Sequence, residues 1–299
     1  MTRPYNSIVL VKQVPDTHNI RGDVMKEDGT INRAALPAIF NPEDLNALEM
    51  ALQVKERYGG TVTVLTMGPA TAAEVLRDAL YRGADRVVLL SDRRFAGADT
   101  LATSYTLQCA IEKLGTYDLV FCGRQAIDGD TAQVGPQTAE KLGIPQITYA
   151  ETIVNLEGDQ IVVERAFPLG KEMVKCALPC LLTVVGSANQ PRPPSARKMI
   201  EYKLAATPLE YKSLLDRWQE FETEEKLETY LAARNLKIPL WSADDLNAQA
   251  DKLGLGGSPT QVHKVNYVIL ETTESKQVSA NAEGVAALMQ ELVKEYIVG

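Results

Sequence analysis

The chain has 299 residues, a formal net charge of −8 at pH 7 and a hydrophobic content of 45%. This length and apolar content are typical of a globular protein with one large domain, or one domain with an appendage, and they exclude an intrinsically disordered chain. The negative charge argues against a nucleic acid as a main partner. No apolar run approaches the ~18 residues that a membrane-spanning helix needs.

Side chains that commonly carry out catalysis or bind metals are few. The only histidines are His18 and His263, and the four cysteines follow no zinc-binding spacing, so we expect reduced, buried thiols. No pair of residues suggests a nucleophile with its base, and any redox chemistry is therefore expected to belong to a bound cofactor. The N-terminal residues lack the pattern of a secretory signal, which predicts a cytoplasmic protein.

The first half of the chain alternates predicted strands with predicted helices. Short apolar runs predict strands at residues 7–14, 61–67, 86–90 and 118–122, with a further short strand or turn within 34–40. Helical spacing predicts helices at residues 41–58, 70–82 and 99–114, the first capped by Asn41 and the third by Asp99. This order predicts a doubly wound, mostly parallel α/β sheet, in which ligands bind at the carboxyl ends of the strands.

From residue 146 the pattern changes to short strands, which predict a β-hairpin region. These strands are predicted at residues 146–149, 151–156, 160–166, 173–178 and 180–185, with a hairpin turn at 157–160 and a solvated turn at Lys171–Glu172. Further predicted elements are a short helix at 196–205, an exposed segment of one or two helices at 208–234, a strand at 265–270 and an amphipathic helix at 280–296. The predicted divisions are an α/β nucleotide-binding core at 1–205, a helical insertion at 206–240 and a C-terminal helical arm at 241–299.

The stretch from Phe121 to Pro136 joins the end of a strand to the start of a helix through a polar loop that contains Gly123 and Gly129. Backbone N–H groups at such a junction, together with the helix dipole, suit a phosphate, and Thr131 is placed to donate a further hydrogen bond. The ordinary alternative is a strand–loop–helix junction that binds nothing, because neither the P-loop motif nor the Rossmann motif is present.

Two helix starts offer further candidate contacts. The run from Asn41 to Asp44 is explained as a helix cap, and it also offers side chains to an adenine or a ribose. Thr100 and Thr103 lie on one face of a helix start, which suits a pyrophosphate as well as a cap. The glycine-rich loop at 253–260 is by itself no more specific than a linker.

The motif from Gly123 to Pro136 resembles the nucleotide-binding motif of the β subunit of electron transfer flavoproteins. Supporting likenesses occur in the same order along the chain, at residues 11–16, 41–44, 66–69, 83–86 and 178–181. The resemblance covers residues 6 to about 205 and returns near 241–262. It implies a heterodimer with an α subunit, on which the C-terminal arm is expected to dock.

The same motif indicates which branch of the family the chain resembles. In the common branch the β subunit holds AMP as a structural ligand, whereas in the electron-bifurcating branch a second FAD takes its place. Gly129 and Ala132 are smaller than the Asp and Asn of the AMP-binding motif, and residues 97–103 and 253–260 also resemble the bifurcating branch. The resemblance therefore implies FAD, with AMP in a canonical β subunit, or in a non-redox AMP-binding module, as the alternatives.

The resemblance also implies which residues contact the nucleotide, and these come from five stretches of the chain. They are Leu10, Asn41, Pro42, Glu43, Asp44, Met67, Thr100, Thr103, Gly123, Arg124, Gln125, Ala126, Ile127, Asp128, Gly129, Asp130, Thr131, Ala132, Gln133 and Val134. Asp128 and Asp130 would repel a phosphate, so we expect them to accept hydrogen bonds from backbone N–H groups or ribose hydroxyls.

The activity implied by the resemblance is electron bifurcation within a complex. NADH would reduce the FAD of this subunit. One electron would pass to ferredoxin or flavodoxin, and the other to the FAD of the α subunit and then to a flavin dehydrogenase, such as one of the acyl-CoA dehydrogenase type. Redox activity with NADH is expected only as part of that complex.

Two departures from the family pattern concern its partners. Residues 191–198 lack the Leu that anchors the dehydrogenase in many relatives, and the segment 208–240 is longer than usual. Its apolar residues Leu214, Leu215, Trp218 and Phe221 are expected either to pack on another subunit or to fold back on the core of this chain.

Overall fold

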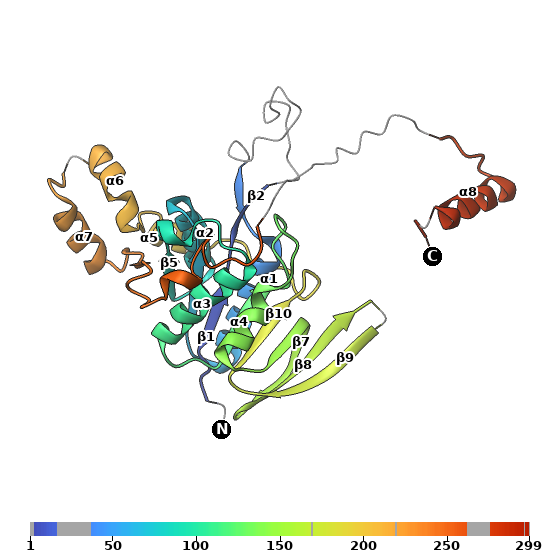
Figure 1. Ribbon diagram of the computed structural model, residues 1–299, viewed down its shortest axis with the longest axis horizontal. Helices are drawn as coiled ribbons and strands as arrows, with labels where there is room; N and C mark the ends of the chain where they lie inside the picture. Colours follow the sequence, from blue (N-terminus) through green and yellow to red (C-terminus); the bar gives the residue numbers. More distant parts are fainter. Residues whose placement is uncertain are drawn as a thin grey trace. The chain divides into compact units, whose positions relative to one another are not determined.

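The computed structural model describes residues 3–16, 37–168, 170–218, 220–261, 276–295 and 297–298. The chain divides into two compact units, Met1–Val262 and His263–Gly299. The first contains the α/β sheet (Figure 1). The strand predicted at 265–270 lies outside the described residues.

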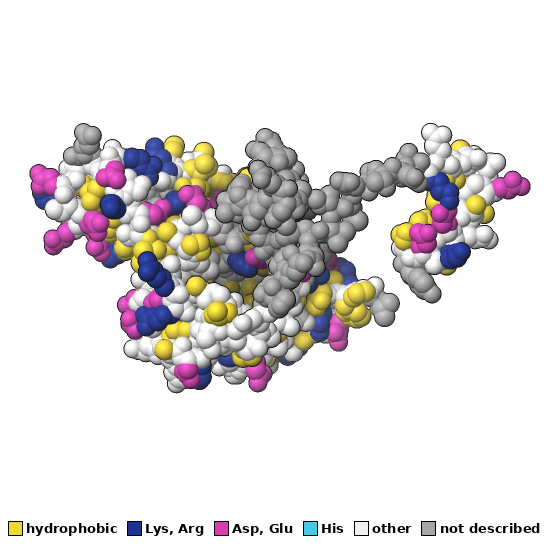
Figure 2. Space-filling view, turned by 45° about the horizontal axis from the view of Figure 1, so that its top comes forward, with side chains coloured by type: hydrophobic (Ala, Val, Ile, Leu, Met, Phe, Trp, Pro, Cys, Tyr) yellow, Lys and Arg dark blue, Asp and Glu magenta, His cyan; other side chains and the backbone are white. Residues whose placement is uncertain are grey.

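The described part of the second unit contains one helix, α8 (Ala282–Lys294), close to the predicted bounds. None of its residues is buried, and Val285, Met289 and Val293, spaced four residues apart, are about half exposed. Figure 2 shows apolar and charged side chains next to one another on this helix. No helix among the described residues is long and apolar enough to cross a membrane.

A sheet of nine strands organises the first unit, in the order β11-β5-β4-β1-β6-β10-β7-β8-β9. The strands that run parallel to their neighbours are β1 (Ser7–Leu10), β4 (Val62–Met67), β5 (Arg86–Leu90), β6 (Leu119–Gly123), β10 (Cys180–Val184) and β11 (Leu240–Trp241). β7 (Gln146–Glu157) pairs parallel with β10 and antiparallel with β8 (Gln160–Phe167), which pairs antiparallel with β9 (Gly170–Ala177). The predicted fold class is confirmed.

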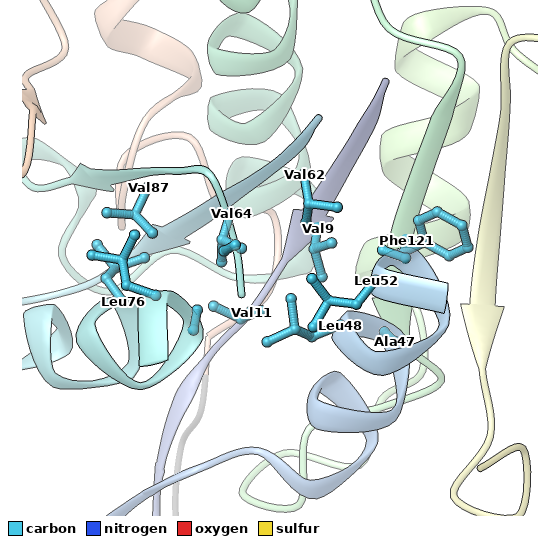
Figure 3. Packing of buried hydrophobic residues seen from close by; sticks show 14 of the residues in the cluster. Val9, Val11, Ala47, Leu48, Leu52, Val62, Val64, Leu76, Val87 and Phe121 are labelled. Carbon is cyan, nitrogen blue, oxygen red and sulfur yellow. The ribbon is translucent and has the colours of Figure 1, made fainter. Parts of the chain in front are cut away.

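Helices cover both faces of the parallel part of the sheet. Successive strand residues point to opposite faces, so each strand contributes apolar side chains to both layers. On one face, α1 (Pro42–Tyr58) and α2 (Ala73–Arg82) pack in a buried cluster that includes Val9 and Phe121, and Figure 3 shows Leu48 and Leu52 of α1 against the strands. On the other, α3 (Thr100–Leu114) and α4 (Val134–Leu142) pack in a cluster that includes Leu10. Buried apolar strands of this kind are typical of a doubly wound sheet.

Several predicted elements differ in detail. The strand expected at 7–14 breaks after Leu10, and β2 (Gln13–Pro15) pairs with β3 (Ala38–Phe40) in a separate antiparallel ribbon. The strands expected at 146–149 and 151–156 form one strand, β7, which bends where Tyr149 adopts a positive φ of 59°. Lys171 and Glu172 lie in β9 instead of a turn, and the Lys171 ammonium contacts the carboxylates of Glu151 and Glu164.

The segment after the sheet folds back on this chain. It contains α5 (Ala196–Tyr202), a 3₁₀ turn at Pro208–Glu210, α6 (Tyr211–Arg217) and α7 (Glu224–Ala233). Further 3₁₀ turns in the unit are Ala70–Ala72, Arg93–Phe95 and Ala250–Lys252. Leu214, Leu227 and Leu231 are buried in the same cluster as α1 and α2, and Arg77 of α2 pairs with Glu210 at 3.0 Å. Of the two alternatives for this segment, packing on its own core is the one observed.

Candidate functional site

The strand order places a topological switch point between β1 and β6. From β1 the chain builds outward through β4 and β5, and then returns to add β6 on the opposite side of β1. Ligands of such sheets bind at the switch point, outside the carboxyl ends of the strands. Leu10, Met67 and Gly123 end strands at this edge.

The start of α1 holds the loop that follows β6. The backbone N–H of Gly123 donates to Asp44 at 2.9 Å, that of Gln125 to Glu43 at 3.0 Å and that of Ile127 to Asn41 at 3.1 Å. Asn41 occupies the predicted N-cap position, but its side chain makes no capping hydrogen bond because it bonds this loop. These three N–H groups point to the start of α1, so they are not available to the phosphate that the sequence predicted for N–H groups at this junction.

Asp44 joins the ends of the two central strands. Its second carboxylate oxygen accepts from the backbone N–H of Lys12 at 2.9 Å. Burial raises the pKa of Asp44 to about 7, against the lowering effect of the N–H groups of Gly123 and Lys12. A Cβ on Gly123 would lie 2.6 Å from the Asp44 carboxylate, so this contact requires glycine. Burial, followed by the nearby Asp44 carboxylate, also raises the pKa of the Cys122 thiol.

The outer part of the loop is held by side chains. Asp128 accepts from the Lys12 ammonium at 2.7 Å, and Asp130 accepts from the Gln125 amide at 3.0 Å. Asp130 and Ala132 adopt positive φ angles of 49° and 53°, which costs the alanine roughly 1 kcal/mol. Nothing lies within 4 Å of a Cβ built on Gly129, so the loop is open there.

The start of α4 presents a row of free donors. The N–H groups of residues 131–135 donate no hydrogen bond to any residue that the structure describes, and Gln133 at the N-cap position makes no side-chain cap. Pro136 has no N–H group. The positive end of the helix dipole lies behind this row, and the arrangement can hold a phosphate.

The start of α3 is different, because Asp99 already caps it as predicted. One carboxylate oxygen of Asp99 accepts from the N–H groups of Leu101 and Ala102 at 2.9 and 3.0 Å. Burial opposes the ionisation of Asp99, but hydrogen bonds from Ala102 and Thr260 outweigh it and hold the pKa of Asp99 below its ordinary value. The Thr100 hydroxyl donates to Gln133 at 3.0 Å, so α3 contributes side chains to this edge while its first backbone donors are occupied.

The structure also adds residues that the motifs did not single out. Lys12 closes over Asp128, and the Arg124 guanidinium, paired with Glu43 at 3.1 Å, lies 5.7 Å from the centre of the Tyr149 ring. Lys12 lies in residues 11–16, one of the stretches that resemble the family, so the sequence contained a signal for it. Tyr149 was not indicated by any motif, and it reaches Arg124 from the point where β7 bends.

Two cavities lie away from this edge. One of about 480 Å³ is on the antiparallel strands beside Asn155, and one of about 310 Å³ lies between α2 and α6 beside Arg77. No predicted site residue lines either cavity. The hydrogen-bonding groups at the switch point therefore define the candidate site more clearly than the cavities do.

Comparisons with known proteins show the family of this chain. The Electron transfer flavoprotein domain matches residues 28–208. The electron transfer flavoprotein subunit beta of Thermoanaerobacterium thermosaccharolyticum is 46% identical over 257 residues, which is 86% of each chain. The caffeyl-CoA reductase-Etf complex subunit CarD of Acetobacterium woodii is 42% identical over 86% of each chain. Protein FixA of Sinorhizobium fredii is 40% identical over 97% of this chain and 91% of its own. The chain belongs to the electron transfer flavoprotein family, among its beta subunits.

Proposed function

We propose that this chain is the β subunit of an electron-bifurcating electron transfer flavoprotein and that it holds FAD at the carboxyl ends of β1 and β6. The observation that carries the proposal is the row of free N–H groups at residues 131–135, at the start of α4. A pyrophosphate supplies the acceptors that these donors lack, and the Thr131 hydroxyl adds another donor.

The other predicted contacts have separate roles in this proposal. Asn41, Glu43 and Asp44 hold the loop in shape through its N–H groups. Leu10 and Met67 close the edge from the strand ends, and Thr100 and Thr103 offer hydroxyls from α3. The open space at Gly129 supports FAD over AMP in this proposal, because a flavin extends beyond the α-phosphate and needs room.

When bound, the flavin supplies hydride and single-electron chemistry, which no side chain of this chain can supply. In this proposal the protein holds the pyrophosphate through the N–H groups at the start of α4. In this proposal NADH is the donor, ferredoxin or flavodoxin receives one electron, and the α subunit with its own FAD passes the other to a dehydrogenase. The relative CarD is named as a subunit of a caffeyl-CoA reductase-Etf complex, which supports a complex with an oxidoreductase for this chain.

The nucleotide content of the purified αβ complex tests the proposal. We expect about two FAD and no AMP per αβ pair when the nucleotides are released by denaturation and identified by chromatography. One FAD with one AMP would instead show the canonical β subunit, because AMP satisfies the same phosphate donors. AMP in a complex that no electron donor reduces would favour the non-redox module.

A further inference from the structure

The glycine-rich loop at 253–260 binds directly to the start of α3. The second carboxylate oxygen of Asp99 accepts from the N–H of Thr260 at 3.1 Å and from its hydroxyl at 2.7 Å. The backbone N–H of Asp99 donates to the Ser258 hydroxyl at 2.8 Å, and that hydroxyl donates to the carbonyl of Gly254 at 2.7 Å. Residues that are far apart in the sequence thus share one hydrogen-bonded cluster.

Close backbone packing holds the loop at 253–260 against residues 94–97. Gly254 has a positive φ of 52°, and a Cβ there would lie 2.2 Å from the carbonyl oxygen of Arg94. The N–H of Leu255 donates to the carbonyl of Ala96 at 3.0 Å, and a Cβ on Gly97 would lie 3.2 Å from the Leu255 side chain. The loop therefore needs glycine at positions 97 and 254 to approach residues 94–97 this closely.

The cluster continues to the row of free donors on α4. Asp99 begins α3, and the next residue, Thr100, donates its hydroxyl to Gln133 at 3.0 Å. Gln133 is the N-cap residue of α4 and belongs to the free row. A continuous path of hydrogen bonds and one peptide bond leads from Thr260 through Asp99 and Thr100 to Gln133.

We propose that Ser258 and Thr260 are positioning residues of the nucleotide site, which hold the start of α3 so that Thr100 and Gln133 present the α4 donors to the pyrophosphate. This inference rests on the proposed function. Capping alone does not account for the cluster, because one oxygen of Asp99 already satisfies the N–H groups of Leu101 and Ala102. Among the residues that the structure describes, the second oxygen bonds Thr260 alone.

Substitutions in the αβ complex test the inference, with FAD and AMP as probes added back to complexes stripped of the β-subunit nucleotide. Ser258→Ala with Thr260→Val removes both hydroxyls and leaves the cap of α3 in place. We expect the Kd for the nucleotide to rise about tenfold, as for the loss of one to two hydrogen bonds. Thr260→Ser keeps the hydroxyl and should stay within about twofold of the unsubstituted protein.

Thr223→Val is the matched control. Thr223 caps α7 through its hydroxyl, away from the sheet edge, so its loss should lower the melting temperature without changing the Kd. Binding within about twofold in the double variant would overturn the positioning role. If the double variant does not fold, the Kd of Thr260→Val alone tests the positioning role. Thr260 is exposed, so its substitution should leave folding intact. A complex that binds neither probe before substitution refutes the proposed function instead.

Discussion

Burial and hydrogen bonding act on the Asp44 carboxylate in opposite directions. Burial is the larger effect and raises its pKa to about 7, while the N–H groups of Gly123 and Lys12 and the side chain of Asn41 favour the charged form. Among the described residues, the Lys12 ammonium and the Cys122 thiol also interact electrostatically with it. At neutral pH the residue that joins β1 to β6 is therefore close to its midpoint of titration.

Asp44 should make the stability of the protein depend on pH. Its pKa is higher in the folded chain than the ordinary 3.8, so its stabilising contribution is complete below about pH 4 and is lost as the pH rises through about 7. The loss amounts to about 4 kcal/mol. Denaturant unfolding at a series of pH values should show a smaller fall in unfolding free energy for Asp44→Asn than for the unsubstituted chain. Parallel pH profiles would contradict the assignment.

A negative charge at residue 131 should compete with the nucleotide. Thr131→Asp places a carboxylate beside the free N–H groups of α4, where we expect it to repel the pyrophosphate and to lower nucleotide affinity at least tenfold. Thr131→Ser keeps the hydroxyl and should bind normally. The measurement is the flavin content after gel filtration, and unchanged content in Thr131→Asp would place the phosphate elsewhere.

Sequence reasoning located these residues better than it assigned their partners. Local spacing identified Asn41 and Asp99 as N-cap residues, and both begin helices. Local spacing contains no information on contacts across the fold, so it did not show that the Asn41 side chain bonds the loop after β6 or that Asp99 holds Thr260. Such partners are set by strand order, which a pattern of apolar residues leaves open.

At the scale of elements, α6 and α7 show how packing determines what an amphipathic pattern does. Their apolar spacing was compatible with another subunit or with the core of this chain. Leu227 and Leu231 are fully buried in the cluster that also contains Ile238, and Trp218 and Phe221 are partly buried against it. The apolar face of an amphipathic helix must be buried, but its sequence does not show which surface buries it.

The packing of α7 predicts a clear difference between two leucines. Leu231→Ala should lower the unfolding free energy by about 2–5 kcal/mol, because it removes a fully buried side chain and leaves a cavity. Leu209→Ala removes a side chain that is half exposed and should change it by less than about 1 kcal/mol. Denaturant titration measures both, and equal losses would mean that α7 does not pack on this core in solution.

Other elements were misjudged where a backbone irregularity interrupts a pattern. The run 7–14 was predicted as one strand although Lys12 and Gln13 interrupt its apolar residues. The chain leaves the sheet after Leu10, and the backbone N–H of Lys12 donates to Asp44 instead. Residues 146–157 looked like two strands because their apolar pattern is interrupted near Tyr149, where the structure has a bulge in one strand.

For the whole molecule, the alternation of strands and helices was sufficient to predict the fold class. The site at the carboxyl ends of the strands stays a prediction. The predicted division into a core at 1–205, an insertion at 206–240 and an arm at 241–299 remains a proposal about roles. Residues 240–241 join the edge of the sheet as β11, and Val285, Met289 and Val293 of α8 are exposed. Docking of the arm on the α subunit remains part of that proposal.

The central place of β1 affects how the protein is made. β1 is synthesised first among the strands, but its neighbour β6 follows only after β4 and β5, and β10 later still. Protein synthesis proceeds at roughly 5–20 residues per second. One side of β1 therefore stays unpaired for several seconds before Leu119 is made and can pair with Ser7. During that interval the edge of β1 is open to wrong pairing. The newly made chain is therefore expected to need protection by chaperones until β6 emerges.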